Sequence, residues 1–285
     1  DHRDLHSFPT RRSSDLIPLL AHATSSDTDV PERDPETHLC EIEFDHVWFA
    51  YSGDDWVLRD VSFRIMKGQR IAFVGPTGGG KTTLISLMFR FYDPQRGRIR
   101  IDGVDIRTIS LDALRQRLGL VMQDIVFFPG TIADNLRLDN PDIPESKIRE
   151  ALEAMNAVDI IDRLPGGLQT ELSEQGANLS VGERQIMSFA RALVYNPDIL
   201  VLDEATSSVD PLTEHRVQEA LGTLLRNRTA LIIAHRLQTI LESDLIMVIQ
   251  RGTLVERGTH AELMRLRGVY WNLYQIQQNG KKEPG

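Results

Sequence analysis

The feature that most constrains this chain is a glycine-rich segment between an apolar run and a helix-forming run. It reads Gly75-Pro76-Thr77-Gly78-Gly79-Gly80-Lys81-Thr82, and Thr83 follows. The flanking residues predict a buried strand at 71–74 and a helix from residue 84 onward. In that context backbone N–H groups and the positive end of the helix dipole converge on a phosphate. The spacing predicts that Lys81 reaches β- and γ-phosphate oxygens and that the Thr82 hydroxyl ligates Mg²⁺.

Polar residues follow three further apolar runs that predict buried strands. Asp203 and Glu204 come after residues 199–202, Gln123 comes after 119–122, and His235 comes after 231–234. Open α/β sheets bind ligands beyond the carboxyl ends of their strands. We therefore expect Asp203 to hold Mg²⁺ through its water shell and Glu204 to polarise the water that attacks the γ-phosphate. Gln123 fits either a polar strand end or a contact with metal or water, and His235 fits either a structural role or a γ-phosphate sensor.

A helical pattern runs from Thr131 to Asn196 and predicts an α-helical subdomain inserted in the sheet domain. Near its end, Ser180 and Gly182 precede a helix. Ser180 is predicted to be the N-cap, and the N–H groups there form a second candidate anion site. Simple helix capping is the alternative interpretation of the same residues.

Tyr51 lies between two segments whose apolar and polar residues alternate as in half-buried strands, which predicts an antiparallel β subdomain. An aromatic residue there fits either a core position or a surface that stacks on a purine base.

Composition excludes several classes of protein. The chain has 41% hydrophobic and 26% charged residues, which is typical of a globular protein, and its net charge of −9 argues against bulk electrostatic binding of nucleic acid. The sequence also lacks the run of about eighteen apolar residues that a membrane-spanning helix requires.

The two ends of the chain differ from its centre. Residues 1–16 match, codon by codon, the translation of a common sequencing adaptor, so we expect them to be a read artefact and the natural chain to continue upstream. Residues 17–39 have the polar composition of a linker. Near the other end we expect a strand hairpin over 245–256, one helix from Thr259 to about Gln278, little chemistry, and a tail at 279–285.

Six segments stand in an order and spacing that resemble the motifs of a nucleotide-binding domain of an ATP-binding-cassette (ABC) transporter. They are similar to the Walker A loop (Gly75 to Thr82), the Q-loop (Gln123), the signature (179–183), the Walker B motif (Asp203-Glu204), the D-loop (207–210) and the H-loop (His235). The resemblance covers roughly residues 40–278. It implies an α/β fold: a P-loop NTPase (RecA-like) core with an antiparallel β subdomain and an α-helical subdomain at about 131–196.

The resemblance also implies an ATPase with ATP and Mg²⁺ as cofactors. Catalysis would fall to Glu204, His235, Gln123 and Lys81, and the metal to Thr82, Gln123 and Asp203. The nucleotide would contact Tyr51, Gly75, Pro76, Thr77, Gly78, Gly79, Gly80, Lys81, Thr82, Thr83, Ser180, Gly182 and Asp210.

An exporter is the favoured subfamily, of the multidrug or lipid type. Residues 170–176 are similar to a coupling segment found in exporters, and Tyr51 matches the position that stacks on adenine. In that family two nucleotide-binding domains face head to tail, and each ATP lies between one Walker A loop and the other domain's signature. The implied partners are a transmembrane domain, upstream in the same polypeptide, and a second nucleotide-binding domain, at the cytoplasmic face of the plasma (inner) membrane.

The signature departs from the family pattern at two positions. Val181 stands where glycine is usual, and Glu183 stands where glutamine is usual. Valine removes backbone freedom, and glutamate brings negative charge to a segment expected to face phosphate. This variant resembles one member of a heterodimeric exporter, with the active Walker A and B motifs here and the better signature on a partner. A homodimeric exporter is the alternative.

Three other classes share part of the pattern. A chromosome-maintenance ATPase would carry a long heptad-patterned insertion between Lys81 and Ser180, and none is present. A nucleotide-dependent switch without hydrolysis would lack the catalytic base, whereas Glu204 is present. An importer ATPase fits the motifs, but the linker-like residues 17–38 and the exporter-like segment around Glu174 argue against it.

Overall fold

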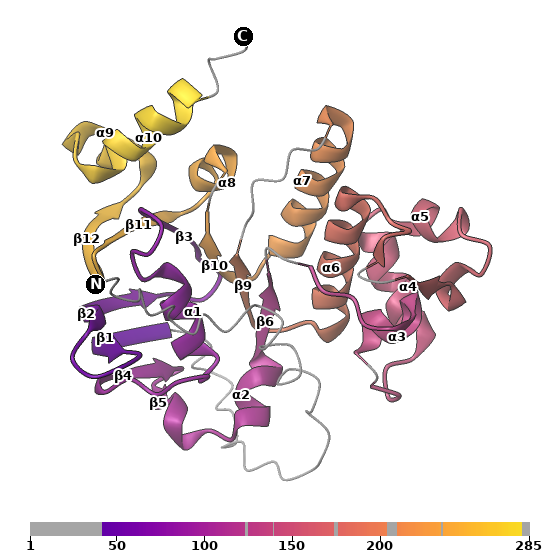
Figure 1. Ribbon diagram of the computed structural model, residues 1–285, viewed down its shortest axis with the longest axis horizontal. Helices are drawn as coiled ribbons and strands as arrows, with labels where there is room; N and C mark the ends of the chain where they lie inside the picture. The colour runs from indigo at the N-terminus through magenta and orange to yellow at the C-terminus, as the bar shows by residue number, and fades with distance from the viewer. Residues whose placement is uncertain are drawn as a thin grey trace, which may run out of the picture.

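The computed structural model describes residues 42–122, 125–138, 140–173, 176–203, 210–234 and 236–280 (Figure 1). They form two main sheets with helices around them, so the predicted α/β class is confirmed. The predicted artefact (1–16), the predicted linker (17–39) and residues 281–285 of the predicted tail lie outside the described residues.

The central sheet has six strands in the order β12-β11-β3-β10-β9-β6. These strands are β3 (Arg70–Val74), β6 (Leu118–Val121), β9 (Ile199–Asp203), β10 (Thr229–Ile233), β11 (Leu245–Gln250) and β12 (Thr253–Gly258). Strands β11, β3, β10, β9 and β6 are parallel to one another, and β12 is antiparallel to β11 at the edge. The carboxyl ends of the parallel strands therefore meet along one side of the sheet, where the predicted site residues lie.

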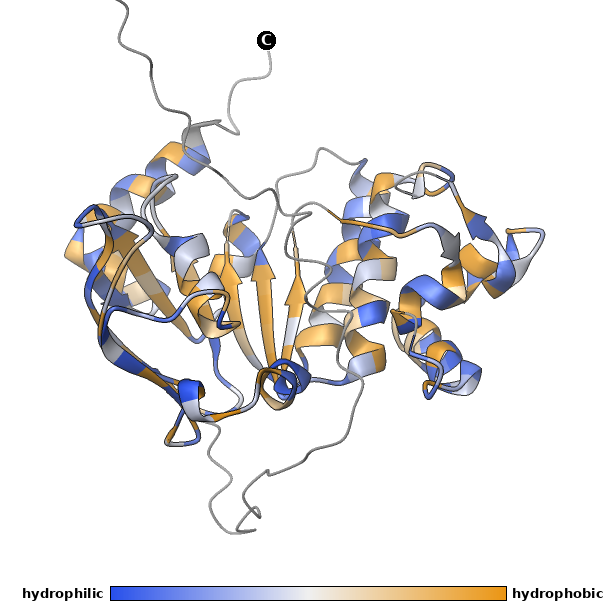
Figure 2. Ribbon diagram, turned by 60° about the horizontal axis from the view of Figure 1, so that its bottom comes forward, coloured by the Kyte–Doolittle hydropathy of each residue, from blue (hydrophilic) through white to orange (hydrophobic). Residues whose placement is uncertain are grey.

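Both faces of this sheet are buried, which explains why its strands are apolar without alternation. In β3, Ile71 and Phe73 pack into one core, whereas Ala72 and Val74 pack into the other. Figure 2 shows the central strands as almost continuously hydrophobic. The sheet thus separates two hydrophobic cores.

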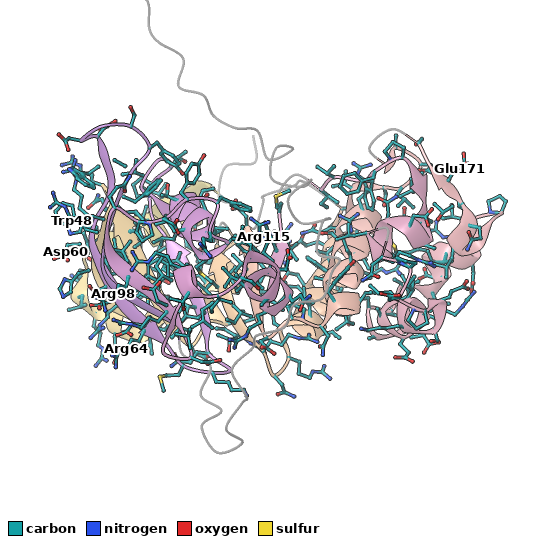
Figure 3. The ribbon with its side chains drawn as sticks, turned by 90° about the horizontal axis from the view of Figure 1, so that it is seen from below. Trp48, Asp60, Arg64, Arg98, Arg115 and Glu171 are labelled. Carbon is teal, nitrogen blue, oxygen red and sulfur yellow. The ribbon has the colours of Figure 1, made fainter. Side chains whose placement is uncertain are left out.

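The first core lies between the central sheet and a four-stranded antiparallel sheet. That sheet has the order β2-β1-β4-β5 and comprises β1 (Ile42–Ala50), β2 (Trp56–Ile65), β4 (Arg96–Ile101) and β5 (Val104–Asp105). Ile42 and Phe44 are buried, whereas Glu43 between them is paired with Arg64 and Arg100. Figure 3 shows Trp48, Asp60, Arg64 and Arg98 along the outer side of this sheet. The predicted alternation is confirmed, and the inner face packs against helix α1 (Lys81–Met88).

The second core lies on the opposite face of the central sheet and is filled by helices. They include α3 (Ile132–Arg137), α4 (Glu145–Ala154), α5 (Val158–Asp162), α6 (Val181–Tyr195) and α7 (Pro211–Leu225), with the small strand pair β7 (Gly130–Thr131) and β8 (Glu171–Leu172) beside them. The shorter elements are η2 (Ile106–Thr108), α2 (Leu111–Arg117), η3 (Gly167–Gln169) and α8 (Leu237–Leu241). Across the described residues, no helix combines the length and apolar character needed to cross a bilayer.

The C-terminal segment differs from the prediction of one helix. It forms α9 (His260–Leu266) and α10 (Val269–Gly280), because Arg267 between them adopts a left-handed conformation with φ 52°. The Glu256 carboxylate accepts the N–H groups of Val269 at 2.6 Å and Tyr270 at 2.9 Å. A carboxylate at the start of a helix satisfies unpaired donors and favours the helix dipole. This contact from β12 makes a second helix start favourable.

Candidate nucleotide-binding site

The glycine-rich segment forms a loop between β3 and α1, as predicted from its context. Pro76, Thr77 and Gly78 are exposed at its rim, whereas Gly79 and Gly80 are buried beneath. Gly80 is the N-cap of α1, with φ 107° and no side chain to accept an N–H group. The first-turn residues of α1 include no acid. The first N–H groups of a helix have no partner within the helix, so this end is open to an external anion.

Lys81 places a positive charge inside the loop. Its side chain is buried, with 7% exposure, and its ammonium donates to the carbonyl oxygens of Gly75 at 2.8 Å and Pro76 at 3.0 Å. Burial lowers the pKa of this ammonium, and the Asp203 carboxylate opposes that shift by raising it. Lys81 and Asp203 therefore act on the same region at the end of the sheet.

Strands β11 and β12 support the loop from the side, although the sequence interpretation assigned little chemistry to this part of the chain. A Cβ atom at Gly75, which has φ 148°, would lie 2.0 Å from the carbonyl oxygen of Ile249. The N–H of Gly252 donates to the carbonyl of Gly79 at 3.0 Å. Glycine is required at position 75 because the backbone of β11 passes directly against the loop. No local pattern in the sequence identifies Ile249 or Gly252 as supports.

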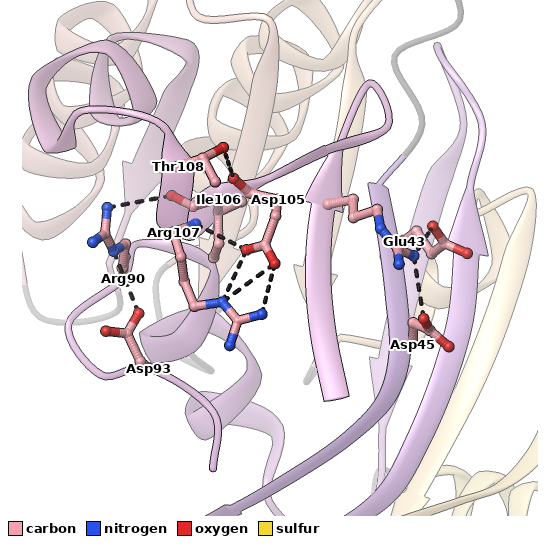
Figure 4. Close-up of polar contacts among 9 residues, drawn as sticks. Glu43, Asp45, Arg90, Asp93, Asp105, Ile106, Arg107 and Thr108 are labelled. Atoms are coloured by element: carbon pink, nitrogen blue, oxygen red, sulfur yellow. Dashed lines mark hydrogen bonds and ion pairs between the residues drawn. The ribbon is translucent and has the colours of Figure 1, made fainter. Parts of the chain in front are cut away.

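The far end of α1 is held by a polar network that the sequence interpretation also missed. Arg90 donates to the carbonyl oxygens of Ile109 at 2.9 Å and Ile106 at 3.3 Å, and its Nε donates to Asp93 at 3.3 Å. Figure 4 shows the contacts of Arg90 with Ile106 and Asp93, beside Asp105, which is paired with Arg107. The helix that carries the loop is thus fixed at both ends.

Tyr51 lies beside the start of α1. Its side chain is 52% exposed, so the interpretation of Tyr51 as a core residue is wrong. Its hydroxyl is 3.2 Å from the Thr83 hydroxyl, and its ring makes edge contacts with Phe49 and Tyr92. These contacts hold the ring next to the loop with an accessible surface, which a stacking role requires.

Asp203 ends β9 on the same side of the sheet as the loop. It pairs in register with Ile233 of β10, and Ile233 pairs with Phe73 of β3. Asp203 is therefore level in the sheet with Phe73, two residues before Gly75. The other predicted strand-end residues, Gln123, Glu204 and His235, lie outside the described residues.

Ser180 is the N-cap of α6, as predicted. Its hydroxyl accepts the N–H of Glu183 at 3.3 Å, and the Glu183 carboxylate accepts the N–H of Ser180 at 2.8 Å, which completes a capping box. The other carboxylate oxygen of Glu183 is paired with Arg163. The negative charge of Glu183 is thus engaged by two donors, and Arg163 was not identified from the sequence.

Gly182 and Asp210 have structural roles beside the predicted ones. A Cβ atom at Gly182 would lie 2.0 Å from the methyl carbon of Thr213 on α7, so glycine is required there for α6 and α7 to pack closely. Asp210 is exposed and is the N-cap of α7, where it accepts the N–H groups of Leu212 at 3.1 Å and Thr213 at 3.0 Å. Its hydrogen bonds with Thr213 lower the pKa of its carboxyl. Helix packing and capping therefore account for both residues without a ligand.

The helices that begin at the loop and at Ser180, α1 and α6, pack in different cores. Helix α1 packs in the first core and α6 in the second, on opposite faces of the central sheet. Figure 1 shows α1 and α6 on opposite sides of β6 and β9. The loop before α1 and the turn before α6 therefore belong to different layers of the fold.

The residues around the loop fit a magnesium nucleotide. The open helix terminus and the buried ammonium suit a polyphosphate, and Thr82 is an exposed residue in the first turn of α1. Hydroxyl and carboxylate oxygens, such as those of Thr82 and Asp203, are ligands that Mg²⁺ prefers. Tyr51 adds an aromatic surface at the edge of the same site.

Comparison with known proteins agrees with this geometry. The family model described as "ABC transporter" matches residues 58–207, more than half of the chain. A fatty acid ABC transporter ATP-binding/permease protein of Mycobacterium bovis is 47% identical over 251 residues, which cover 86% of this chain and 40% of that protein. An ATP-dependent lipid A-core flippase of Alkalilimnicola ehrlichii is 47% identical over 241 residues, covering 84% of this chain and 41% of that protein.

A solved structure gives the same result. A bacterial Atm1-family ABC exporter with ATP bound is 42% identical and superposes with a TM-score of 0.77, covering 84% of this chain and 42% of that one. The chain spans about two fifths of the length of these relatives. The predicted P-loop NTPase fold is confirmed, and the chain belongs to the ABC transporter family, as a nucleotide-binding domain of the exporter type.

Proposed function

We propose that this chain binds MgATP at the loop before α1 and hydrolyses it to drive export of a substrate across a membrane. The observation that carries the proposal is the arrangement of an uncapped helix terminus, the buried Lys81 ammonium and the Asp203 carboxylate at one end of the parallel sheet. The membership of the ABC transporter family supports ATP as the nucleotide.

Each residue has a defined task in this proposal. The α1 N–H groups and Lys81 would hold the phosphates, and Tyr51 would stack on the base. Thr82 and Gln123 would ligate Mg²⁺, and Asp203 would hold it through its water shell. The metal, when bound, neutralises charge that develops on the phosphates. Glu204 accepts the proton of the attacking water, and His235 contacts the γ-phosphate. We assign these two roles from the sequence resemblance.

The active unit in this proposal is a pair of domains. Helices α1 and α6 lie on opposite faces of the sheet, which supports a Ser180 turn that meets an ATP held by another domain rather than by its own loop. Val181 and Glu183 differ from the usual signature, which supports a heterodimer in which the partner supplies the better one. Asp210 would face the nucleotide at the same interface.

The remainder of the transporter lies outside this sequence in our proposal. Curated relatives combine ATP-binding and permease parts, and the chain matches about two fifths of their length. We therefore infer a transmembrane domain in the same polypeptide, with this domain at the cytoplasmic face of the plasma membrane. The relatives' names support a multidrug or lipid class of substrate.

The test is ATP turnover of the full chain as a function of protein concentration, with Glu204→Gln as the control. Turnover that rises more steeply than linearly and vanishes in the control indicates that the chain forms composite sites with itself. ATP binding without turnover at any concentration indicates that a partner signature is needed. Failure to bind ATP at all would refute the proposal.

A further inference from the structure

An ion pair lies directly at the start of α6. One oxygen of the Glu183 carboxylate accepts the N–H of Ser180 at 2.8 Å, and the other is paired with the Arg163 guanidinium. The Arg163 side chain is 61% exposed, whereas the Glu183 side chain is 18% exposed. The positive member of the pair therefore faces solvent, and the negative member is largely covered.

The charge of Glu183 presents a physical problem if this turn meets an ATP phosphate. A carboxylate near a polyphosphate repels it, and the repulsion is strong where water is excluded. Burial raises the pKa of the Glu183 carboxyl, but the Ser180 N–H and the Arg163 guanidinium together outweigh burial and lower it. Glu183 is thus ionised at neutral pH, and its charge needs compensation.

Arg163 is held where it can supply that compensation. Its Nε donates to the carbonyl of Asp159 at 3.3 Å within the last turn of α5. Arg216 of α7 in turn donates to the Asp159 carboxylate at 2.8 Å and to the carbonyl of Asn156 at 3.0 Å. Helix α5 is therefore tied to α7 and to the first turn of α6, and the Arg163 guanidinium does not depend on Glu183 alone for its position.

We propose that Arg163 is a positioning residue of the composite ATP site. Through its pair with Glu183 it neutralises the carboxylate at the start of α6, so that this turn does not repel the phosphates of an ATP held by the opposing domain. This inference rests on the proposed function, because it requires the Ser180 turn to meet such an ATP. It assigns a compensating cation to the unusual signature of this chain.

The experiment measures ATP-dependent self-association of the full chain by sedimentation, in a Glu204→Gln background that blocks hydrolysis. Arg163→Ala, Arg163→Lys, Glu183→Gln and the double variant Arg163→Ala/Glu183→Gln are compared. Arg149→Ala is the matched control, because Arg149 is 58% exposed and paired at 2.7 Å with Glu145 within α4, not with a residue of the signature. ATP binding to the dilute monomer is measured in parallel, which reports the loop before α1.

We expect Arg163→Ala to raise the ATP concentration for half-maximal association about fivefold, the scale of one partly exposed charge pair. Arg163→Lys should recover most of the loss, since it keeps the charge. In the Glu183→Gln background, Arg163→Ala should have no effect, because no carboxylate remains to neutralise. Arg149→Ala and monomer binding of ATP should be unchanged.

A purely structural role for Arg163 predicts a different pattern. An Arg163→Ala defect that persists with Gln at position 183, or that Lys does not relieve, overturns the inference. If the Glu204→Gln protein binds ATP but never self-associates, with or without Glu183→Gln, the inference is overturned for this chain. The proposal that the loop before α1 binds ATP is not affected by that result. Loss of ATP binding in the Glu204→Gln protein overturns the proposed function itself.

Discussion

The starts of α1 and α6 are both helix N-termini, but only at α6 do side chains accept the unpaired backbone N–H groups. Before α1, Gly80 provides no side chain, and the buried Lys81 ammonium adds a positive charge. Before α6, the Ser180 hydroxyl and the Glu183 carboxylate accept backbone N–H groups, and Arg163 balances the carboxylate. One helix start is left open, and the other is closed by its own side chains.

This difference shows what glycine and side-chain caps do at a helix N-terminus. Unpaired N–H groups are available in every helix, and a side-chain oxygen that accepts them competes with any external anion. The loop before α1 avoids that competition by having no cap, and it adds a cation. The turn before α6 must either give up its internal contacts or bind an anion alongside them.

The largest expected effect comes from removing the cation at the open terminus. Lys81→Ala should lower ATP turnover by about 100-fold or more, because the phosphates would lose the charge of the buried Lys81 ammonium. Steady-state turnover of the full chain measures it. Lys67→Ala is the matched control, since Lys67 lies exposed in a turn. Equal turnover in the Lys81 and Lys67 variants would contradict the assigned role.

A second test compares a glycine of the loop that is packed against β11, Gly75, with an exposed glycine at the rim of the loop, Gly78. Gly75→Ala should lower the free energy of unfolding by about 3 kcal/mol, because the new methyl meets the Ile249 carbonyl oxygen at 2.0 Å. Gly78→Ala should cost only about 1 kcal/mol, because Gly78 has φ 75° but open space around it. Urea denaturation compares the two. A Gly78 variant as unstable as the Gly75 variant would show that close packing is not the cause.

The start of α6 can be tested through the contact between Gly182 of α6 and Thr213 of α7. Gly182→Ala should lower the free energy of unfolding by about 2 kcal/mol, because its methyl would overlap the Thr213 methyl. Thr213→Ser should relieve much of that loss, since it removes the methyl and keeps the hydroxyl. Gly222→Ala on α7, with nothing within 4 Å, should be neutral or stabilising and serves as the control. An unrelieved loss in Gly182→Ala/Thr213→Ser would point to a cause other than this contact.

The smallest expected effect concerns the charge in the capping box. The folded-state pKa of Glu183 is lowered from its ordinary value of 4.5. Its contribution to stability is therefore fully present above that value and is lost as pH falls through the folded-state pKa. The stability lost in Glu183→Gln should be below about 1 kcal/mol at pH 7 and should disappear in acid. Urea denaturation between pH 3.5 and 7 measures it; a difference that grows as pH falls would contradict the pairing.

Local patterns predicted much of this structure. The strand, loop and helix around Lys81 and the N-cap at Ser180 follow from residues adjacent in the chain, and all are observed. The break between α9 and α10 was missed, because Glu256, the residue that caps the second helix, lies thirteen positions earlier. Such a contact leaves no periodic signal in the sequence.

The amino-acid sequence by itself determined the two-sheet α/β class, the family resemblance and the candidate residues for binding phosphate, because apolar periodicity and short motifs act locally. Tertiary structure alone decided which backbone supports the loop at Ile249, why position 182 must be glycine, and that Arg163 balances Glu183. These contacts join segments brought together only by burial of the two cores. Which residues meet at these contacts depends on how the folded segments pack, not on the spacing of residues along the chain.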